Sequence, residues 1–263
     1  MTSIAGIELE LFERGAGDPL LYLHGGAGIG IDLPFIELVA KERRVVAPSH
    51  PGFGKSSLPD WLDSIDDIAH VYLELMDRLH LSRADVIGFS IGGWIAAELA
   101  TKVPDRINRL VLIGPVGVKT GSTDKLDIPD IFAMPRKKLD ALRFHDPKHA
   151  ADWASMSDEE LHIVARNRET LALLTWEPYM HNPKLKHRLH RVEVPVLFMR
   201  GASDRIVSAE YLARYAALLP RASIATIAQA GHLPHVEQPE TTALKILQFL
   251  NSRETLAPPG ARS

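Results

Sequence analysis

The sequence predicts an α/β fold, in which a mostly parallel sheet carries helices on both faces and a helical cap is inserted into the core. Three observations support this expectation. The 263 residues are 46% hydrophobic and 24% charged, as in ordinary globular chains. Short apolar runs alternate with segments of helical spacing, which is the pattern of a parallel sheet covered by helices. One long charged segment interrupts this alternation and contains no strand-like run.

The expected strands differ in how they are buried. Residues 7–12 alternate apolar and acidic side chains, which favours a half-exposed strand. The runs that follow are almost wholly apolar, as is typical of strands buried on both faces. These runs are Leu20–Leu23, Arg44–Pro48, Asp85–Phe89, Leu110–Ile113 and Val196–Met199. A last strand is expected near Ser223–Ala228.

Helices are expected between these runs. Ile65–His80 places apolar side chains at steps of three and four, which lines one face of a helix. Ile91–Lys102 is rich in alanine and ends before Pro104, where a helix should stop. Two further helices are expected near Ala209–Leu218 and Glu240–Leu250.

The interruption divides the chain. We expect residues 118–191 to form a helical cap over the strand ends, with one helix over Glu159–Leu174. Residues 1–117 and 192–255 would then form the core. Residues 256–263, which include two prolines and a glycine, are expected to be a flexible tail.

Composition excludes several classes of protein. The formal net charge of −3 provides no basic field for nucleic acid or an anionic membrane. The chain has no cysteine, which excludes disulfides, thiolate metal sites and a cysteine nucleophile. It also has no run of about 20 apolar residues that could span a membrane. The N-terminus does not resemble a signal peptide, so we expect a cytoplasmic protein.

The strongest chemical signal is Gly88-Phe89-Ser90-Ile91-Gly92, between an expected strand and an expected helix. A G-x-S-x-G pattern in this context places the serine on a sharp bend, with its hydroxyl exposed at the carboxyl edge of the sheet. The glycines leave room where a Cβ would clash. A serine that only caps the helix is the alternative, but the strand–turn–helix context favours a nucleophile.

A nucleophilic serine needs a general base. The chain has 12 histidines, and His232 stands apart because it directly follows an expected strand and precedes the last helix. We therefore expect His232 at the same sheet edge as Ser90. His235 is the alternative base.

The base in turn needs a carboxylate that orients it. Asp204 follows the strand that ends at Met199, whereas the loop after Leu110–Ile113 has no carboxylate before Asp124. Asp204 is therefore the expected acid, although it could instead cap the next helix. Glu237 is an alternative acid.

An oxyanion needs two N–H donors. The Ile91 N–H lies free at the start of a helix, where partial positive charge accumulates. The turn His24-Gly25-Gly26-Ala27 follows the strand Leu20–Leu23 and can aim the Gly26 N–H into the same site. We expect His24 to brace this turn.

With these residues in place, the chain resembles the α/β-hydrolase superfamily, in particular the capped serine hydrolases that include esterases and meta-cleavage-product hydrolases. The order Ser90, Asp204, His232 is the order of that fold. The stretches at residues 50–56 and 231–237 are also similar to family members, and the insertion falls where the family places its cap. The resemblance covers nearly the whole chain and implies a Ser-His-Asp triad with no cofactor and no metal.

Other sites fit the sequence less well. Residues 52–56 end like a phosphate-binding loop, but Ser49 stands where that motif needs glycine. A dinucleotide turn would need glycine at Ile31. His232, His235 and Glu237 could be imagined as metal ligands, but the chain has no H-E-x-x-H pattern.

The expected partner is a small-molecule substrate, with no nucleic acid and no membrane. Serine at residue 90 argues against the epoxide-opening and halide-displacing relatives, which carry aspartate there. We favour hydrolysis of a small carboxylic ester or related acyl compound. The alternative is C–C bond hydrolysis of a vinylogous 1,5-diketone in aromatic degradation, and a non-catalytic binding module is a further alternative.

Four residues bear on that choice. An anionic dienoate would need a basic residue in the cap, and Arg166 and Arg168 lie on an expected cap helix. Trp176 could line an apolar pocket. Leu233 follows the expected catalytic histidine, where the C–C hydrolases commonly have tryptophan, so this position favours an ester substrate. A homodimer is a common expectation for capped members.

Overall fold

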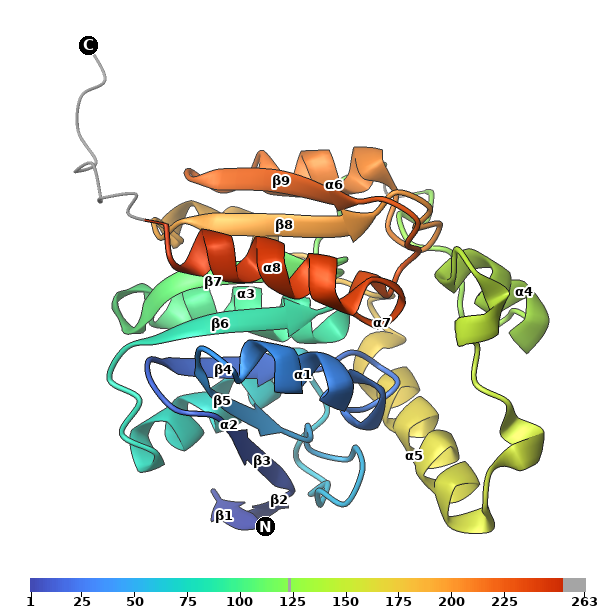
Figure 1. The fold of residues 1–263 in the computed structure, drawn as a ribbon, viewed down its shortest axis with the longest axis horizontal. Coiled ribbons are helices and arrows are strands. Elements are labelled where there is room, and N and C mark those ends of the chain that lie inside the picture. Colours follow the sequence, from blue (N-terminus) through green and yellow to red (C-terminus); the bar gives the residue numbers. More distant parts are fainter. Residues whose placement is uncertain (123, 253–263) are drawn as a thin grey trace.

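A computed structural model describes residues 1–122 and 124–252, and it confirms the α/β fold (Figure 1). The expected tail at residues 256–263 lies outside the described residues. The main sheet has seven strands in the order β3-β5-β4-β6-β7-β8-β9. Their bounds are β3 (Leu11–Arg14), β4 (Pro19–Leu23), β5 (Arg44–Pro48), β6 (Ala84–Phe89), β7 (Ile107–Ile113), β8 (Val196–Gly201) and β9 (Ala222–Ile227). All neighbouring pairs are parallel except β3 with β5.

The prediction of a single strand at residues 7–12 is wrong, because the chain forms two strands in this region. β2 (Ile7–Leu9) pairs with β1 (Thr2–Ile4) in a separate antiparallel sheet, whereas β3 joins the main sheet. Glu10 separates them, and its backbone N–H donates to the Ser56 hydroxyl at 3.0 Å. The Glu10 oxygen accepts from the Ser49 N–H at 2.8 Å, so both backbone groups of Glu10 bond outside the first ladder.

Helices cover both faces of the main sheet, as the alternation predicts (Figure 1). One hydrophobic cluster contains side chains of α2 (Ile65–Arg78), α3 (Ile91–Lys102) and α6 (Ala209–Ala216). A second cluster contains side chains of α1 (Leu33–Val39) and α8 (Pro239–Leu250). Successive residues of β4 enter opposite clusters, because side chains alternate across a strand. Helix α1 has only seven residues and was not predicted from the sequence.

The described residues between β7 and β8 contain no strand, and the two α-helices among them lie beyond one end of the sheet (Figure 1). Here α4 (Arg136–Arg143) and α5 (Asp158–Thr175) are joined by short 3₁₀ turns. Ser157 begins α5, and its side chain and that of Glu160 form a reciprocal capping box. We call residues 118–191 the cap.

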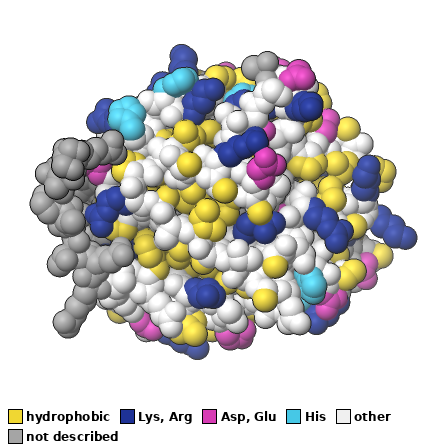
Figure 2. Space-filling view, turned by 90° about the horizontal axis from the view of Figure 1, so that it is seen from above, with side chains coloured by type: hydrophobic (Ala, Val, Ile, Leu, Met, Phe, Trp, Pro, Cys, Tyr) yellow, Lys and Arg dark blue, Asp and Glu magenta, His cyan; other side chains and the backbone are white. Residues whose placement is uncertain are grey.

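The opposite edge of the main sheet from β3 is formed by β9, which pairs with β8 alone. In the view from above, hydrophobic side chains gather among scattered Lys and Arg side chains (Figure 2). Ile224 of β9 is 48% exposed.

No helix within the described ranges has the length and apolar character needed to cross a membrane.

Candidate active site

Ser90 lies at the sharp turn between β6 and α3. Its φ of 54° and ψ of −113° are strained for a residue with a side chain. The turn depends on close backbone approaches: a Cβ on Gly88 would lie 2.3 Å from the Gly92 oxygen, and one on Gly92 would lie 2.1 Å from the Leu23 oxygen. The two glycines therefore permit the strained serine, as the G-x-S-x-G pattern predicts.

The structure brings Ser90, His232 and Asp204 together at the carboxyl edge of the sheet. Asp204 follows β8, and His232 follows β9 and precedes α7 (Pro234–Glu237). The His232 Nδ1 lies 3.0 Å from the Asp204 Oδ2, and the His232 Nε2 lies 3.2 Å from the Ser90 Oγ. Asp204 and His232 are each only 5% exposed.

The second oxygen of the Asp204 carboxylate fixes its orientation. This Oδ1 accepts hydrogen bonds from the backbone N–H groups of Ile206 and Val207, at 2.8 and 2.9 Å. The Oδ2 is left to accept the Nδ1–H of His232. That tautomer leaves the Nε2 of His232 as an acceptor for the Ser90 hydroxyl proton.

The alternative base and acid are engaged elsewhere. The His235 Nε2 lies 2.9 Å from the Asp32 Oδ1, and both side chains are fully buried. The Glu237 carboxylate accepts hydrogen bonds from three backbone N–H groups, those of Gly231, His145 and Asp146. Glu237 therefore joins the His232 loop to the cap instead of orienting the imidazole.

The two expected oxyanion donors lie beside Ser90. Ile91 is the first residue of α3, and Gly26 lies on the turn after β4; both line the same cavity as Ser90. Within the described residues neither of their N–H groups donates to another protein group. Both donors are thus available to a bound oxyanion.

A stack of two buried histidines braces the Gly26 turn. The rings of His24 and His50 are 3.7 Å apart. The His24 Nδ1 donates to the Gly25 oxygen at 2.7 Å, and its Nε2 accepts from the His50 N–H at 2.8 Å. Burial lowers the pKa of His24 to about 4 and lowers the pKa of His50 well below its ordinary value. Both rings are therefore neutral at pH 7.

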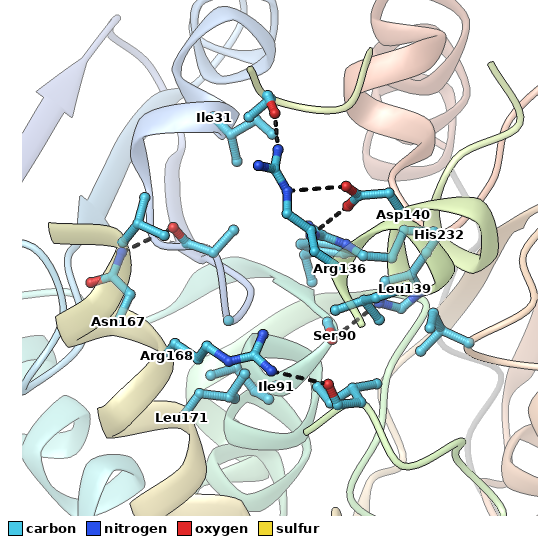
Figure 3. Close-up of a pocket in the computed structure, with 18 of the residues that line it drawn as sticks. Ile31, Ser90, Ile91, Arg136, Leu139, Asp140, Asn167, Arg168, Leu171 and His232 are labelled. Carbon is cyan, nitrogen blue, oxygen red and sulfur yellow. Dashed lines mark hydrogen bonds and ion pairs between the residues drawn. The ribbon is translucent and has the colours of Figure 1, made fainter. Parts of the chain in front are cut away.

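Ser90 and His232 open into a cavity of about 510 Å³ between the sheet edge and the cap. Much of its lining is apolar and comes from both core and cap, including Val116, Ile128, Leu139, Leu171, Met180 and Ile206. Figure 3 shows the side chains of α4 and α5 around Ser90. A mostly apolar cavity of this size suits a small organic substrate.

Three arginines line this cavity, and they differ in their partners. Arg136 and Arg143 share Asp140, at 3.2 and 3.8 Å. The Arg168 guanidinium contacts the Ile131 oxygen at 3.4 Å, and in the described part of the chain no carboxylate lies within ion-pair distance of it. Arg168 points from α5 into the cavity (Figure 3), so its charge is available to a ligand.

The structure does not place the other three expected substrate residues at the cavity. Arg166 lies two residues from Arg168 and hence on a different helix face; it donates instead to the Gly54 and Ser56 carbonyls. Trp176 is 56% exposed and packs on Phe132 with ring centres 5.8 Å apart. Leu233 is fully buried in the cluster beneath α1 and α8.

Three residues of α4 that line the cavity, Arg136, Leu139 and Arg143, were not predicted from the sequence. The α4 segment reads Arg-Lys-Lys-Leu-Asp-Ala-Leu-Arg, and this density of charge is typical of a solvated helix. Asn167 was missed too, because a lone asparagine within a helix carries no sequence signal.

The fold and this site define a hydrolase, and the chain belongs to the alpha/beta hydrolase family, whose model matches residues 20–244. It is 31% identical to a 2-hydroxymuconate semialdehyde hydrolase of Pseudomonas sp. (strain CF600), over 96% of this chain and 94% of that one. It is 30% identical to a 2-hydroxy-6-oxo-2,4-heptadienoate hydrolase of Pseudomonas putida, over 90% and 91% of the two chains. A solved esterase from Thermogutta terrifontis shares the fold, with a TM-score of 0.76, 24% identity and 95% of each chain covered.

Proposed function

We propose that this hydrolase cleaves a small, mostly apolar carboxylic ester through an acyl-enzyme on Ser90. The observation that carries the proposal is the continuous hydrogen-bonded chain from Asp204 through His232 to Ser90, which ends at an apolar cavity. The strained backbone of Ser90 supports the same role, because strain of this kind clusters at functional sites.

The geometry supports a two-step reaction. His232 takes the proton of the Ser90 hydroxyl, and the Ser90 Oγ attacks the ester carbonyl. The Gly26 and Ile91 N–H groups bind the oxyanion. Asp204 stabilises the imidazolium that forms, and His232 then protonates the leaving alcohol.

The second step regenerates the enzyme. Water enters beside His232, which takes one of its protons as the oxygen attacks the acyl-enzyme. The same two N–H groups stabilise the second oxyanion. The Ser90 Oγ leaves with the proton from His232, and the free acid departs.

Ser90→Ala tests this proposal directly. We would compare wild type, Ser90→Ala and the exposed-strand control Ser223→Ala on p-nitrophenyl esters of increasing acyl length. Triad members act as a unit, so Ser90→Ala should lower kcat by at least about 10³-fold, while Ser223→Ala retains activity. Full turnover by Ser90→Ala would disprove the acyl-enzyme, and silence of the wild type on all acyl substrates would favour a binding module.

C–C bond hydrolysis of an anionic dienoate is the second candidate. Arg168 supports it, because a guanidinium free of carboxylate partners can bind a substrate carboxylate. The names of the two Pseudomonas relatives point the same way. Ketonisation of the dienol would precede attack by Ser90.

Arg168→Met separates the two candidates. If a dienoate is the substrate, this change should raise KM for a dienoate ring-cleavage product by about 10-fold or more, the loss of one charge-assisted contact. KM for a neutral aryl ester should stay nearly unchanged. Arg166→Met is the control, since Arg166 lies on the same helix but outside the cavity. Equal effects of Arg168→Met on both substrates would refute the carboxylate contact.

A homodimer and a cytoplasmic location stay predictions.

A further inference from the structure

We propose that Asn167 of the cap helix α5 is a positioning residue for the oxyanion site. It would act through the turn that carries Gly26, without touching substrate at the reacting atoms. This inference rests on the proposed serine hydrolase mechanism, because it concerns one of the two oxyanion donors of that mechanism.

The turn to be positioned comprises residues 25–28. The Gly28 N–H closes it by donating to the Gly25 oxygen at 3.0 Å. His24 anchors its first residue through the hydrogen bond from Nδ1 to the Gly25 oxygen. Its far arm, Ala27 and Gly28, turns toward the cap, and Gly28 has a φ of +87°. The position of the Gly26 N–H therefore depends on how both arms are held.

Asn167 holds the far arm. Its Nδ2 donates to the Ala27 oxygen at 3.0 Å (Figure 3), and its Oδ1 accepts from the Gly54 N–H at 2.9 Å. The side chain is only 3% exposed, so water does not readily replace either contact. The fit is close, because a Cβ on Gly28 would lie 2.4 Å from the Asn167 Nδ2. One amide thus bridges the loop after β4 and the loop after β5.

The neighbours of Asn167 attach α5 to the core at a place outside the Gly26 turn. Arg166 donates to the Gly54 oxygen at 3.0 Å and to the Ser56 oxygen at 2.5 Å. Thr170 donates to the Gly52 oxygen at 2.9 Å. These hydrogen bonds attach the helix to the loop after β5, but neither Arg166 nor Thr170 hydrogen-bonds to the Gly26 turn. Within the described residues, Asn167 is the only member of this trio with a hydrogen bond to the turn.

Loss of the Asn167 amide should therefore affect the transition state more than substrate binding. The Ala27 carbonyl would lose its partner, and the turn could rock about its His24 anchor. Removing one oxyanion donor costs about 10²–10³ in kcat, and a donor misplaced by about 1 Å costs up to about 10²-fold. The apolar lining that binds the substrate would remain in place, so KM should change little.

The test compares Asn167→Ala with Thr170→Val. Thr170 is a matched control, because it is equally buried at 3% and its hydrogen bond also joins α5 to a core loop. With p-nitrophenyl butyrate, Asn167→Ala should lower kcat by at least about 10-fold with KM within about 3-fold. Thr170→Val should keep kcat within about 2-fold of wild type. Equal kcat values in the two folded variants would overturn the inference.

Asn167→Asp provides a second variant of the same shape. The aspartate keeps an acceptor for the Gly54 N–H but aims an oxygen at the Ala27 carbonyl, so it should lower kcat as much as alanine does. Amide hydrogen exchange should become faster at residues 25–28 in both Asn167 variants and not in Thr170→Val. Unchanged exchange there would also overturn the inference.

Phosphonylation of Ser90 by a fluorophosphonate separates failure of this inference from failure of the proposed function. If wild type neither reacts with the probe nor hydrolyses the ester, the proposed function fails. If wild type reacts and both Asn167 variants react at its rate, the mechanism stands and the positioning role is refuted.

Discussion

Acid should destabilise this fold through the stacked histidines behind the Gly26 turn. The Nε2 of His24 accepts the His50 N–H, so a proton added there would face another donor. Burial lowers the pKa of His24 from 6.5 to about 4. Folded His24 therefore binds its proton less tightly than unfolded His24.

The sign and size of the effect follow from this difference. Between pH 6.5 and about 4 the unfolded state binds more protons, so the free energy of unfolding falls as pH falls. One pKa unit corresponds to about 1.4 kcal/mol, which gives a loss of about 3 kcal/mol from His24 by pH 4. The lowered pKa of His50 acts in the same direction.

Urea unfolding at several pH values between 7.5 and 4, followed by circular dichroism, would measure this loss. His24→Gln keeps an oxygen that can accept the His50 N–H but does not titrate. The gap in unfolding free energy between wild type and His24→Gln should shift by about 3 kcal/mol over this range, in favour of the variant at low pH. His162→Gln, at an exposed position of α5, is the control for replacing a histidine by glutamine. Parallel curves for wild type and His24→Gln would refute the reasoning.

Three further predictions concern the frame of the site. Asp204→Asn should lower kcat by about 10³–10⁴-fold, because the amide favours the wrong imidazole tautomer. If kcat on a panel of esters falls by less than about 10-fold, Asp204 is not the orienting acid. Gly92→Ala should lower the free energy of unfolding by about 3 kcal/mol or more, because its Cβ would lie 2.1 Å from the Leu23 oxygen. Gly30→Ala is the control, since a Cβ there would have no atom within 4 Å. Equal stability of the two variants in urea would contradict this prediction. Glu237→Gln should cost about 1–3 kcal/mol, since its amide would oppose a backbone N–H, and unchanged thermal unfolding would contradict that.

The sequence predicted the parts of this molecule that depend on local rules. Buried strands read as apolar runs, and the elbow at Ser90 requires glycines at fixed spacing. The carboxyl ends of parallel strands lie at one edge of the sheet. The sequence therefore predicted that Asp204 and His232, which follow different strands, lie close together. The structure places their side chains within hydrogen-bonding distance of one another and of Ser90.

Side-chain direction within the cap was not predictable in the same way. The two arginines at residues 166 and 168 have the same chemistry, and only the packed helix shows that Arg168 lines the cavity while Arg166 anchors α5 to the core. Trp176 of the cap is more than half exposed and packs on Phe132. Leu233, which lies outside the cap, is buried in the core one residue after His232. Such choices depend on tertiary packing, which a single sequence does not encode locally.

The bridges between cap and core have a consequence for cooperativity. Residues 118–191 are continuous in the chain, yet their removal would leave the buried carboxylate of Glu237 without the His145 and Asp146 N–H groups. The Ala27 carbonyl would lose Asn167 as well. Buried polar groups without partners are costly, so a core stripped of its cap would be a poor folding unit. We therefore expect insertion and core to melt together in one transition.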